Sequence, residues 1–464
     1  MAVPASVGPT PLRILLALHQ FPPVGAGGTE QLVRWTALGL QQNGHAASIV
    51  SAVPRRRGTA TEVPVDHHDA DGLEVHFLTP TPGIGDTSRR ITREFDDSDA
   101  GAAFGHAIDA ARPDVIHFFH LAGLTAAAMR QATTRRIPFI LTITDFWFEC
   151  PTVQLLLDDE SLCDGPRGDR MNCARHLAMI RWPAMRPLGL AALADRPAAA
   201  AIKAMSGMPG VANAARALRA LQSRSDVLRD AMSCAAAVVA PNAYMRARLL
   251  AFGVPDKKLH LVPYGVPAAA TTPVQASRER SALRPRVIFI GTLAVSKGAH
   301  LLLEALRIAG DLDVDVDIYG GLQADDYAAK LQQLAGADPR VQFRGTFDNR
   351  QFADVLDAAD LLVIPSLWNE NSPLVLLQAL AQRCPVLVAD VPGLAAHMRP
   401  ALDGWTFVRG NADDLARQLR RICRDGAARA AVRATPYVAR TLAPYLTDLM
   451  QLYGNAVAAH GGKA

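Results

Sequence analysis

The stretch that decides the fold is VIFIGTLAVSKGAHLLLEAL, residues 287–306. Its first four residues form an apolar run of the length of a buried strand, and an apolar pattern of helical period begins near Ala299. Between them lies a short loop that carries Lys297 and two glycines. A strand that leads through such a loop into a helix is the repeating unit of a parallel sheet with crossover helices. We therefore predict that residue 287 opens a doubly wound domain.

The same alternation extends from this unit in both directions. Short apolar runs separated by helical patterns lie at 12–18, 46–53, 75–78, 115–118, 138–143, 237–240 and 259–263 before it, and at 314–319, 341–344, 361–364 and 386–389 after it. A chain of 464 residues also exceeds what one hydrophobic core usually organises. The pattern predicts an α/β protein with two Rossmann-like doubly wound domains in tandem, and we expect a ligand to bind in the cleft between them.

Breaks in the alternation give the domain organisation. We assign residues 1–265 to the first domain, with an insertion at about 150–225 where Cys-containing and then Arg-rich, Pro-broken sequence interrupts the pattern. Residues 266–285, rich in Pro, Ala, Thr and Ser, form a linker, and residues 286–435 form the second domain. The helical stretch within 436–464 has no strand after it, so it is free to pack back on the first domain.

Composition excludes several classes of function. Half of the residues are apolar, a fifth are charged, and the formal net charge of +4 is small for this length. The arginines are scattered among acidic residues, so nucleic acid is not an expected partner. The first eleven residues lack the features of a signal peptide, and no apolar run is long enough for a membrane span. We expect a cytoplasmic protein whose six cysteines are reduced.

Two loops at the ends of predicted strands carry groups suited to phosphate. After the first strand, Gly27 and Gly28 precede a helix, where backbone amides can approach a phosphate or a sugar. After the strand at 287–290, Thr292 and Lys297 lie on the connecting loop, and the lysine ammonium can meet a diphosphate. Turn-forming glycines and a solvated lysine are the plainer interpretations of these loops.

A third loop supplies a carboxylate. Residues 365–373 read PSLWNENSP and follow the strand at 361–364. Glu370 can accept hydrogen bonds from sugar hydroxyls at this edge, and the start of the next helix favours phosphate. Ser372 and Pro373 match a helix N-cap followed by proline at the first helical position. Capping explains these two residues but does not explain Glu370.

Together these motifs resemble the retaining GT-B glycosyltransferases, a family that includes bacterial mannosyl- and glucosyltransferases. The similarity covers nearly the whole chain and rests on GGTE at 27–30, GTLAVSKG at 291–298, VIPS at 363–366, and ENSPL at 370–374 leading to QAL at 378–380. It implies catalytic roles for Glu370, His120 and Lys297. It also implies a donor site built from Gly27, Gly28, Thr292, Lys297, Asn371, Ser372, Pro373, Leu374 and Gln378.

The chain departs from the family pattern at several positions. In the family's E-x7-E motif the first Glu contacts the donor sugar and the second holds the ribose, and Gln378 replaces the second. Ala396 stands where the family has a Glu beside the donor, Phe119 where many members have the second His of His-x-His, and Thr144 where a His precedes Asp145. These changes keep an alternative open, a GT-B protein that binds a nucleotide sugar or a partner enzyme without turnover. An oxidoreductase is disfavoured because the G-x-G-x-x-G fingerprint is missing.

The resemblance implies sugar transfer from a nucleotide-diphosphate sugar to a hydroxyl of a glycan or lipid-linked acceptor, with retention and with no metal or other cofactor for catalysis. Residues 179–224 mix Leu, Met and Ala with Arg and Lys, which suits peripheral contact with an anionic membrane, at its inner face in a cytoplasmic protein. Helical packing over the first domain is the alternative.

Four residues with metal-binding side chains fall in the irregular stretch after the strand at 138–143: Cys150, Cys163, Cys173 and His176. The two-residue gap between Cys173 and His176 lets both reach one metal, and the other two thiols complete a tetrahedral Cys₃His set. The resembling subgroup tends to carry Cys at all four places, so His176 would replace one ligand by another. We expect a structural zinc site; buried reduced thiols are the alternative.

Overall fold

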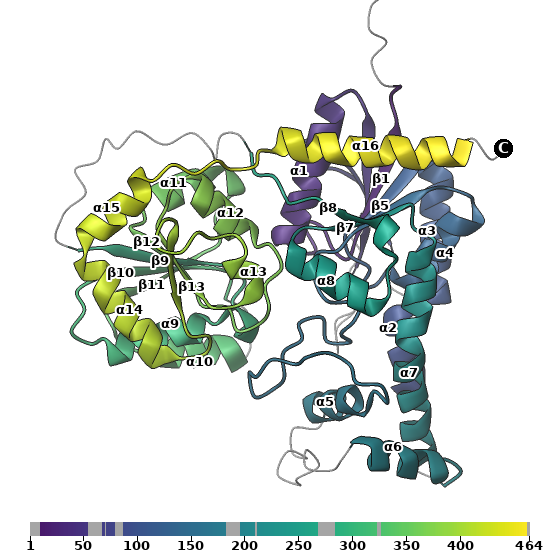
Figure 1. Ribbon diagram of the computed structural model, residues 1–464, viewed down its shortest axis with the longest axis horizontal. Helices are drawn as coiled ribbons and strands as arrows, with labels where there is room; N and C mark the ends of the chain where they lie inside the picture. The colour runs from purple at the N-terminus through teal and green to yellow at the C-terminus, as the bar shows by residue number, and fades with distance from the viewer. Residues whose placement is uncertain are drawn as a thin grey trace, which may run out of the picture.

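The computed structural model describes residues 10–53, 67–69, 71–78, 87–181, 195–208, 211–267, 284–322 and 326–461. Most of the expected linker and part of the expected insertion lie outside these residues. Within them the strands form two sheets that lie side by side in the molecule, each with helices packed around it (Figure 1). The predicted α/β class with two Rossmann-like units is confirmed.

The first sheet has eight strands among the described residues, in the order β3-β4-β2-β1-β5-β6-β7-β8. All neighbours pair in parallel except β3 and β4. The order of the chain reverses at β1, which has β2 on one side and β5 on the other. Open α/β sheets bind their ligands at such a switch point, beyond the carboxyl ends of the strands. The strands are β1 (Arg13–Leu18), β2 (Ala46–Ala52), β3 (His67–His68), β4 (Glu74–Leu78), β5 (Val115–Phe118), β6 (Phe139–Thr142), β7 (Ala237–Ala240) and β8 (Leu259–Leu261).

Strand β1 is apolar after its first residue, from Ile14 to Leu18, as expected of a strand with both faces buried. Leu15 and Ala17 pack in a core with Phe104, whereas Ile14 and Leu16 pack in a separate core on the other face. The helices of this domain are α1 (Gly28–Gln42), α2 (Thr87–Phe95), α3 (Ser98–Ala111), α4 (Thr125–Thr134), α5 (Met171–Arg181), α6 (Asp195–Ala204), α7 (Val211–Ser233) and α8 (Ala243–Phe252), with a 3-10 turn η3 (Asp256–Lys258).

The second sheet has six parallel strands among the described residues, in the order β11-β10-β9-β12-β13-β14. Its switch point lies between β9 and β12. Its strands are β9 (Arg286–Ile290), β10 (Asp315–Tyr319), β11 (Val341–Gly345), β12 (Leu361–Ile364), β13 (Val386–Ala389) and β14 (Gly404–Phe407). Its helical segments are η5 (Val295–Lys297), α9 (Ala299–Ile308), α10 (Asp326–Ala335), η6 (Asn349–Gln351), α11 (Phe352–Asp357), α12 (Leu374–Ala381), α13 (Pro392–Ala395), α14 (Ala412–Arg424) and α15 (Gly426–Ala434).

The last helix, α16 (Leu442–Gly461), returns to the first domain and lies against α1 (Figure 1). Its Tyr453 hydroxyl is 2.7 Å from His117 Nδ1, and Thr142 Oγ1 is 2.8 Å from His117 Nε2. Burial lowers the pKa of His117 to about 3, so this ring stays neutral. His117 thereby joins the C-terminal helix to the middle of the first sheet.

The segment between β6 and β7 forms an arm of helices α5, α6 and α7 that projects beyond the first sheet (Figure 1). Helix α7 packs on α2 and α4, and it also contacts α5 and α6. Helix α7 begins at Val211, inside the expected insertion, because its Ala- and Arg-rich sequence has a helical pattern. None of the helices in the described ranges has both the length and the apolar character that crossing a membrane requires.

Candidate functional site

The carboxyl ends of β9 and β12 flank the switch point of the second sheet, and each leads to one of the charged residues expected in the site. Lys297 ends the turn η5 after β9, and Glu370 lies on the loop after β12. The two side chains meet, with Lys297 Nζ 2.7 Å from Glu370 Oε1. Glu370 is 3% exposed, so solvent screens this attraction less than it screens a surface ion pair.

Backbone contacts hold these two loops against each other. Leu367 N donates to Ser296 O at 2.8 Å. Gly298 has φ 72°, and a Cβ at this position would lie 1.9 Å from Pro365 O. Only glycine allows both this left-handed backbone and this close approach. Gly298 thus lets the lysine loop pack directly on the glutamate loop.

Polar groups surround the ion pair. Ser366 Oγ donates to Glu370 Oε1 at 2.7 Å, and Lys297 Nζ lies 4.9 Å from the centre of the Trp368 ring. Within the described part of the chain, Trp368 Nε1 and Asn369 Oδ1 are buried without a hydrogen-bond partner. Buried polar groups are nearly always paired, so these atoms mark hydrogen bonds that the chain alone does not supply. The sequence pattern had singled out neither residue.

The residues that follow Glu370 reach the first domain. Asn242, the N-cap of α8, donates through Nδ2 to the carbonyl oxygen of Asn371, to Asn371 Oδ1 at 3.0 Å and to Ser372 Oγ at 3.2 Å. Asn371 Nδ2 in turn donates to Ile143 O at 2.9 Å. These buried amides tie the glutamate loop of the second domain to β6 and α8 of the first.

Helix α12 begins at Leu374, and its N-cap is Pro373. The expected cap at Ser372 is therefore wrong. The Ser372 hydroxyl is held instead by Asn242 and by His397, whose Nε2 lies 2.9 Å away. Burial lowers the pKa of His397, which favours a neutral ring beside this loop.

The remaining donor residues expected in the second domain differ in how far their side chains are buried. Leu374 is buried in a core of the first domain, so it contributes to the domain contact. Gln378 is buried farther along α12, whereas Thr292 is exposed on the lysine loop. Among the donor residues that the structure describes, Lys297 is the one on the neighbouring loop whose side chain bonds to Glu370.

Four titratable side chains gather at the switch point of the first sheet. His19 follows β1, His120 follows β5, Asp145 follows β6, and Glu30 lies in the first turn of α1. The two imidazole rings stack with centroids 4.0 Å apart, and His120 Nε2 lies against Asp145 Oδ2. His19 Nε2 lies 3.4 Å from Glu30 Oε1. The sequence pattern named only His120; examining the residues just beyond each predicted strand would have added His19 and Asp145.

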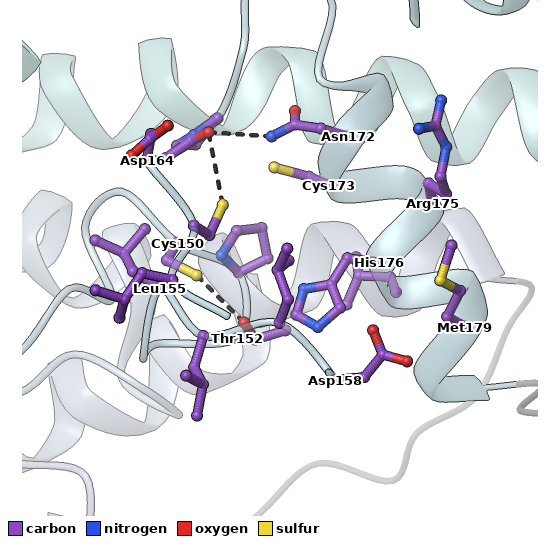
Figure 2. A pocket seen from close by; sticks show the side chains of 18 of the residues that line it. Cys150, Thr152, Leu155, Asp158, Asp164, Asn172, Cys173, Arg175, His176 and Met179 are labelled. Atoms are coloured by element: carbon purple, nitrogen blue, oxygen red, sulfur yellow. Dashed lines mark hydrogen bonds between the residues drawn. The ribbon is translucent and has the colours of Figure 1, made fainter. Parts of the chain in front are cut away.

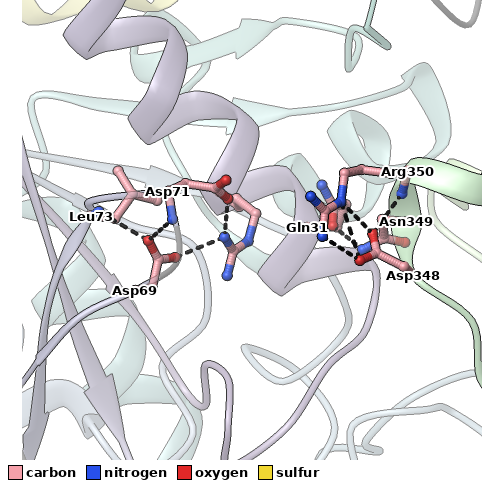
Figure 3. A network of polar contacts seen from close by, with 8 residues as sticks. Gln31, Asp69, Asp71, Leu73, Asp348, Asn349 and Arg350 are labelled. Carbon is pink, nitrogen blue, oxygen red and sulfur yellow. Dashed lines mark hydrogen bonds and ion pairs between the residues drawn. The ribbon is translucent and has the colours of Figure 1, made fainter.

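The glycine loop begins α1 beside this cluster. Gly27 is the N-cap of α1, and a Cβ there would lie 2.9 Å from Glu30 Oε2, whereas a Cβ at Gly28 would meet nothing within 4 Å. One residue after Glu30, Gln31 receives a hydrogen bond from Asn349 Nδ2 of η6 across the domain boundary (Figure 3). The start of α1 therefore also faces the second domain.

The departures from the family pattern have structural partners of their own. Phe119 is buried, with its ring centroid 4.1 Å from that of His117, and Thr144 Oγ1 donates to Phe119 O at 2.9 Å. Ala396 directly follows α13, in which Gly393 allows close approach to the Glu370 backbone, since a Cβ there would lie 1.4 Å from Glu370 O. Helix α13 thus backs onto the glutamate without adding a second carboxylate.

The four side chains expected to bind zinc line one pocket of about 410 Å³ between the loop after β6 and α5 (Figure 2): Cys150, Cys163, Cys173 and His176. In the ranges that the structure covers, no three His, Cys, Asp or Glu side chains are grouped so as to hold a metal ion, and the zinc site stays a prediction. Cys150 Sγ lies 3.2 Å from Thr152 Oγ1, and Cys163 Sγ donates to Gly165 O at 3.8 Å. Burial raises the pKa of the Cys173 thiol to about 12.

Two family models match the sequence. Residues 274–436 match glycosyl transferases group 1, and residues 27–172 match the glycosyl transferase 4-like domain. A D-inositol 3-phosphate glycosyltransferase of Streptomyces bingchenggensis is 31% identical over 164 residues, which are 35% of this chain and 34% of that protein. An MMP alpha-(1->4)-mannosyltransferase of Mycolicibacterium hassiacum is 29% identical over 192 residues, 39% of this chain and 45% of that protein. The match thus spans less than half of each relative.

Solved structures resemble the chain over nearly its whole length. Sucrose-phosphate synthase from Thermosynechococcus elongatus superposes with a TM-score of 0.62 at 18% identity, covering 96% of this chain and 99% of that one. Anabaena Alr3699/HepE in complex with UDP and glucose has a TM-score of 0.62 at 13% identity, with coverage of 96% and 99%. At these identities the likeness concerns the fold.

Proposed function

We propose that this chain, a member of the group 1 glycosyltransferase family with the GT-B fold, moves a sugar from a nucleotide-diphosphate sugar to an acceptor hydroxyl with retention of configuration. One observation carries the proposal: the Lys297–Glu370 pair stands at the switch point of the second sheet. Ligands of such sheets bind at that place. At that place the lysine ammonium suits the diphosphate of a nucleotide sugar, and the carboxylate suits the hydroxyls of its sugar.

The proposed roles follow from charge. The Lys297 ammonium moves from Glu370 to the diphosphate and neutralises the charge that develops as it leaves. Glu370, still held by Ser366, accepts hydrogen bonds from hydroxyls of the transferred sugar. Asn369 Oδ1 and Trp368 Nε1 offer an acceptor and a donor beside it. Gln378 contacts the ribose through its amide. These residues supply the charge stabilisation of the transfer without a metal.

Binding without turnover is the second candidate, and it rests on the substitutions at Gln378, Ala396, Phe119 and Thr144. Phe119 and Thr144 make contacts that account for them structurally, and Lys297 and Glu370 meet at the switch point of the second sheet. These observations favour catalysis.

The acceptor is proposed to be a glycan or lipid-linked hydroxyl. The arm of α5, α6 and α7 exposes three large apolar side chains, Ile180, Met205 and Met208. With Lys203 also exposed on α6, this arm is suited to peripheral contact with an anionic membrane.

A screen of UDP, GDP and ADP sugars tests the function. A ligand at 100 times its Kd stabilises the folded state by about 2.7 kcal/mol, which a thermal-shift assay detects. For a donor that binds, release of the nucleoside diphosphate measures turnover, and NMR of the anomeric proton of the product reports retention. UDP-glucose is tested first because the Anabaena protein of the same fold was solved in complex with UDP and glucose. Turnover should persist in EDTA. Protein that neither binds nor cleaves any of these donors contradicts the proposal.

A further inference from the structure

Hydrogen bonds at the switch point of the first sheet determine which ring nitrogen of His120 carries its N–H. The backbone N–H of Ala122 donates to His120 Nδ1 at 3.0 Å, so this nitrogen presents its lone pair. With Nδ1 accepting, the N–H of the ring is on Nε2, which faces Asp145 Oδ2. Both ring nitrogens are thus engaged within the protein, and neither is left to contact a substrate.

Asp145 differs in this respect. Its Oδ1 accepts a hydrogen bond from Trp147 N at 2.8 Å, and its Oδ2 faces His120. A carboxylate can accept about four hydrogen bonds, so this one retains capacity for further donors. Its side chain is 15% exposed, against 6% for His120. The open acceptor atoms of the pair therefore belong to the aspartate.

Position brings this carboxylate close to the proposed donor site. Two residues before Asp145, Ile143 O accepts the hydrogen bond from Asn371, the neighbour of Glu370. One residue after it, the Phe146 ring makes an edge contact with Trp368 of the glutamate loop, with centroids 6.3 Å apart. Asp145 thus stands between two direct contacts with the second domain.

The remaining members of the cluster hold His120 in place. The His19 ring stacks on it at an interplanar angle of 34°, and His19 Nε2 lies 3.4 Å from Glu30 Oε1 of α1. Burial, with His120 nearby, lowers the pKa of His19 well below its usual value, and burial raises that of Glu30. Within the described residues, His19 Nδ1 is buried and has no hydrogen-bond partner. His120 is therefore fixed by a ring, a backbone amide and a carboxylate.

We propose that Asp145 accepts a hydrogen bond from a substrate hydroxyl and that His120 is the positioning residue that aims it. This inference rests on the proposed function and changes the role that the resemblance implied for His120. The hydroxyl belongs either to the transferred sugar or to the acceptor. Both sources present the same chemistry to the carboxylate.

Three variants test the proposal with whichever UDP, GDP or ADP sugar the wild-type protein turns over. Asp145→Asn retains the side-chain shape and removes the charge. His120→Gln retains a side-chain amide able to donate to Asp145, whereas His120→Ala does not. Asp109→Asn on α3, which breaks a surface pair with Arg135 at the end of α4, serves as the matched control for loss of a first-domain carboxylate. Circular dichroism and the melting temperature monitor folding.

We expect Asp145→Asn and His120→Ala to lower kcat by about 10- to 100-fold, the range expected for loss of one charged hydrogen bond. His120→Gln should keep most of the activity, and Asp109→Asn should match wild type. In every variant the Kd of the free nucleoside diphosphate should stay within about twofold of the wild-type value, since we place the diphosphate on the second domain. Slower hydrolysis without acceptor assigns the hydroxyl to the sugar; slower transfer alone, with a raised acceptor KM, assigns it to the acceptor.

Full activity of folded Asp145→Asn in both reactions overturns the inference and leaves the proposed function intact. Loss of activity in His120→Gln equal to that in His120→Ala also overturns it, because the imidazole itself would then be required. A wild-type protein that turns over no nucleotide sugar overturns the proposed function, and the inference with it.

Discussion

Lys297 and Glu370 lie 73 positions apart in the chain, and their side chains meet with Nζ 2.7 Å from Oε1. The contact follows from topology, because β9 and β12 are neighbours in the sheet although β10 and β11 separate them in sequence. A parallel sheet brings the carboxyl ends of such strands to one edge. In the protein without donor, each residue thus satisfies the charge of the other.

The close packing of the two loops predicts that Gly298→Ala is strongly destabilising. The variant would combine a left-handed backbone with a Cβ placed 1.9 Å from Pro365 O. We expect a loss of about 2 to 4 kcal/mol in the free energy of unfolding, measured by urea denaturation. Gly44→Ala is the matched control, since Gly44 has φ 83° and no atom within 4 Å of the new Cβ; it should cost only about 1 kcal/mol. Equal losses in the two variants would mean that the contact with Pro365 does not constrain the loops.

The domain contact at Asn242 gives a second prediction. Asn242→Asp keeps an oxygen that caps α8 by accepting from Met245 N, but it removes the Nδ2 donor and sets a charge against Asn371 O. We expect this variant to lose about 1 to 3 kcal/mol of stability, largely in the coupling of the two domains. Calorimetry should then resolve separate transitions of the two domains. A single transition at the wild-type temperature would show that these hydrogen bonds do not couple the domains.

The ribose role proposed for Gln378 predicts a change in donor affinity. Gln378→Glu removes the amide donor while preserving size, so the donor KM should change several-fold and kcat much less. Initial rates over a range of donor concentrations measure both quantities. An unchanged KM would place this side chain away from the ribose.

The helical arm predicts weak, salt-sensitive binding to anionic membranes. Flotation with liposomes that contain phosphatidylserine should carry the protein upward at low salt, and about 0.5 M salt should release it through screening. Neutral liposomes are the control for the lipid, and Met205→Ser with Met208→Ser is the control for the exposed apolar side chains. Protein that stays in the soluble fraction with anionic vesicles at low salt rules out the membrane contact.

The fold could be predicted because strands buried on both faces leave continuous apolar runs, as in β5 and β12. The short strand β14, with Trp405 and Thr406 less buried, leaves no such run and was missed. The charged residues of the second domain could be predicted because each follows a strand at the switch point. The partners of Asn371 and Ser372 could not, because Asn242 comes from another domain and only folding brings it close. The zinc site stays a prediction: its three thiols and His176 line one pocket, but spacing along a loop does not fix where the side chains point.

The measurement that tests the central claim most directly is the turnover of Lys297→Ala and Glu370→Ala at saturating donor, with Glu370→Gln as the variant that keeps shape and loses charge. Asp114→Ala, which breaks an exposed pair with Arg13, controls for loss of a salt bridge outside the site. If the pair forms the donor site, each change at Lys297 or Glu370 lowers kcat by about 100-fold or more while the protein stays folded, and the control matches wild type. Turnover near the wild-type rate in either folded alanine variant would contradict the assignment.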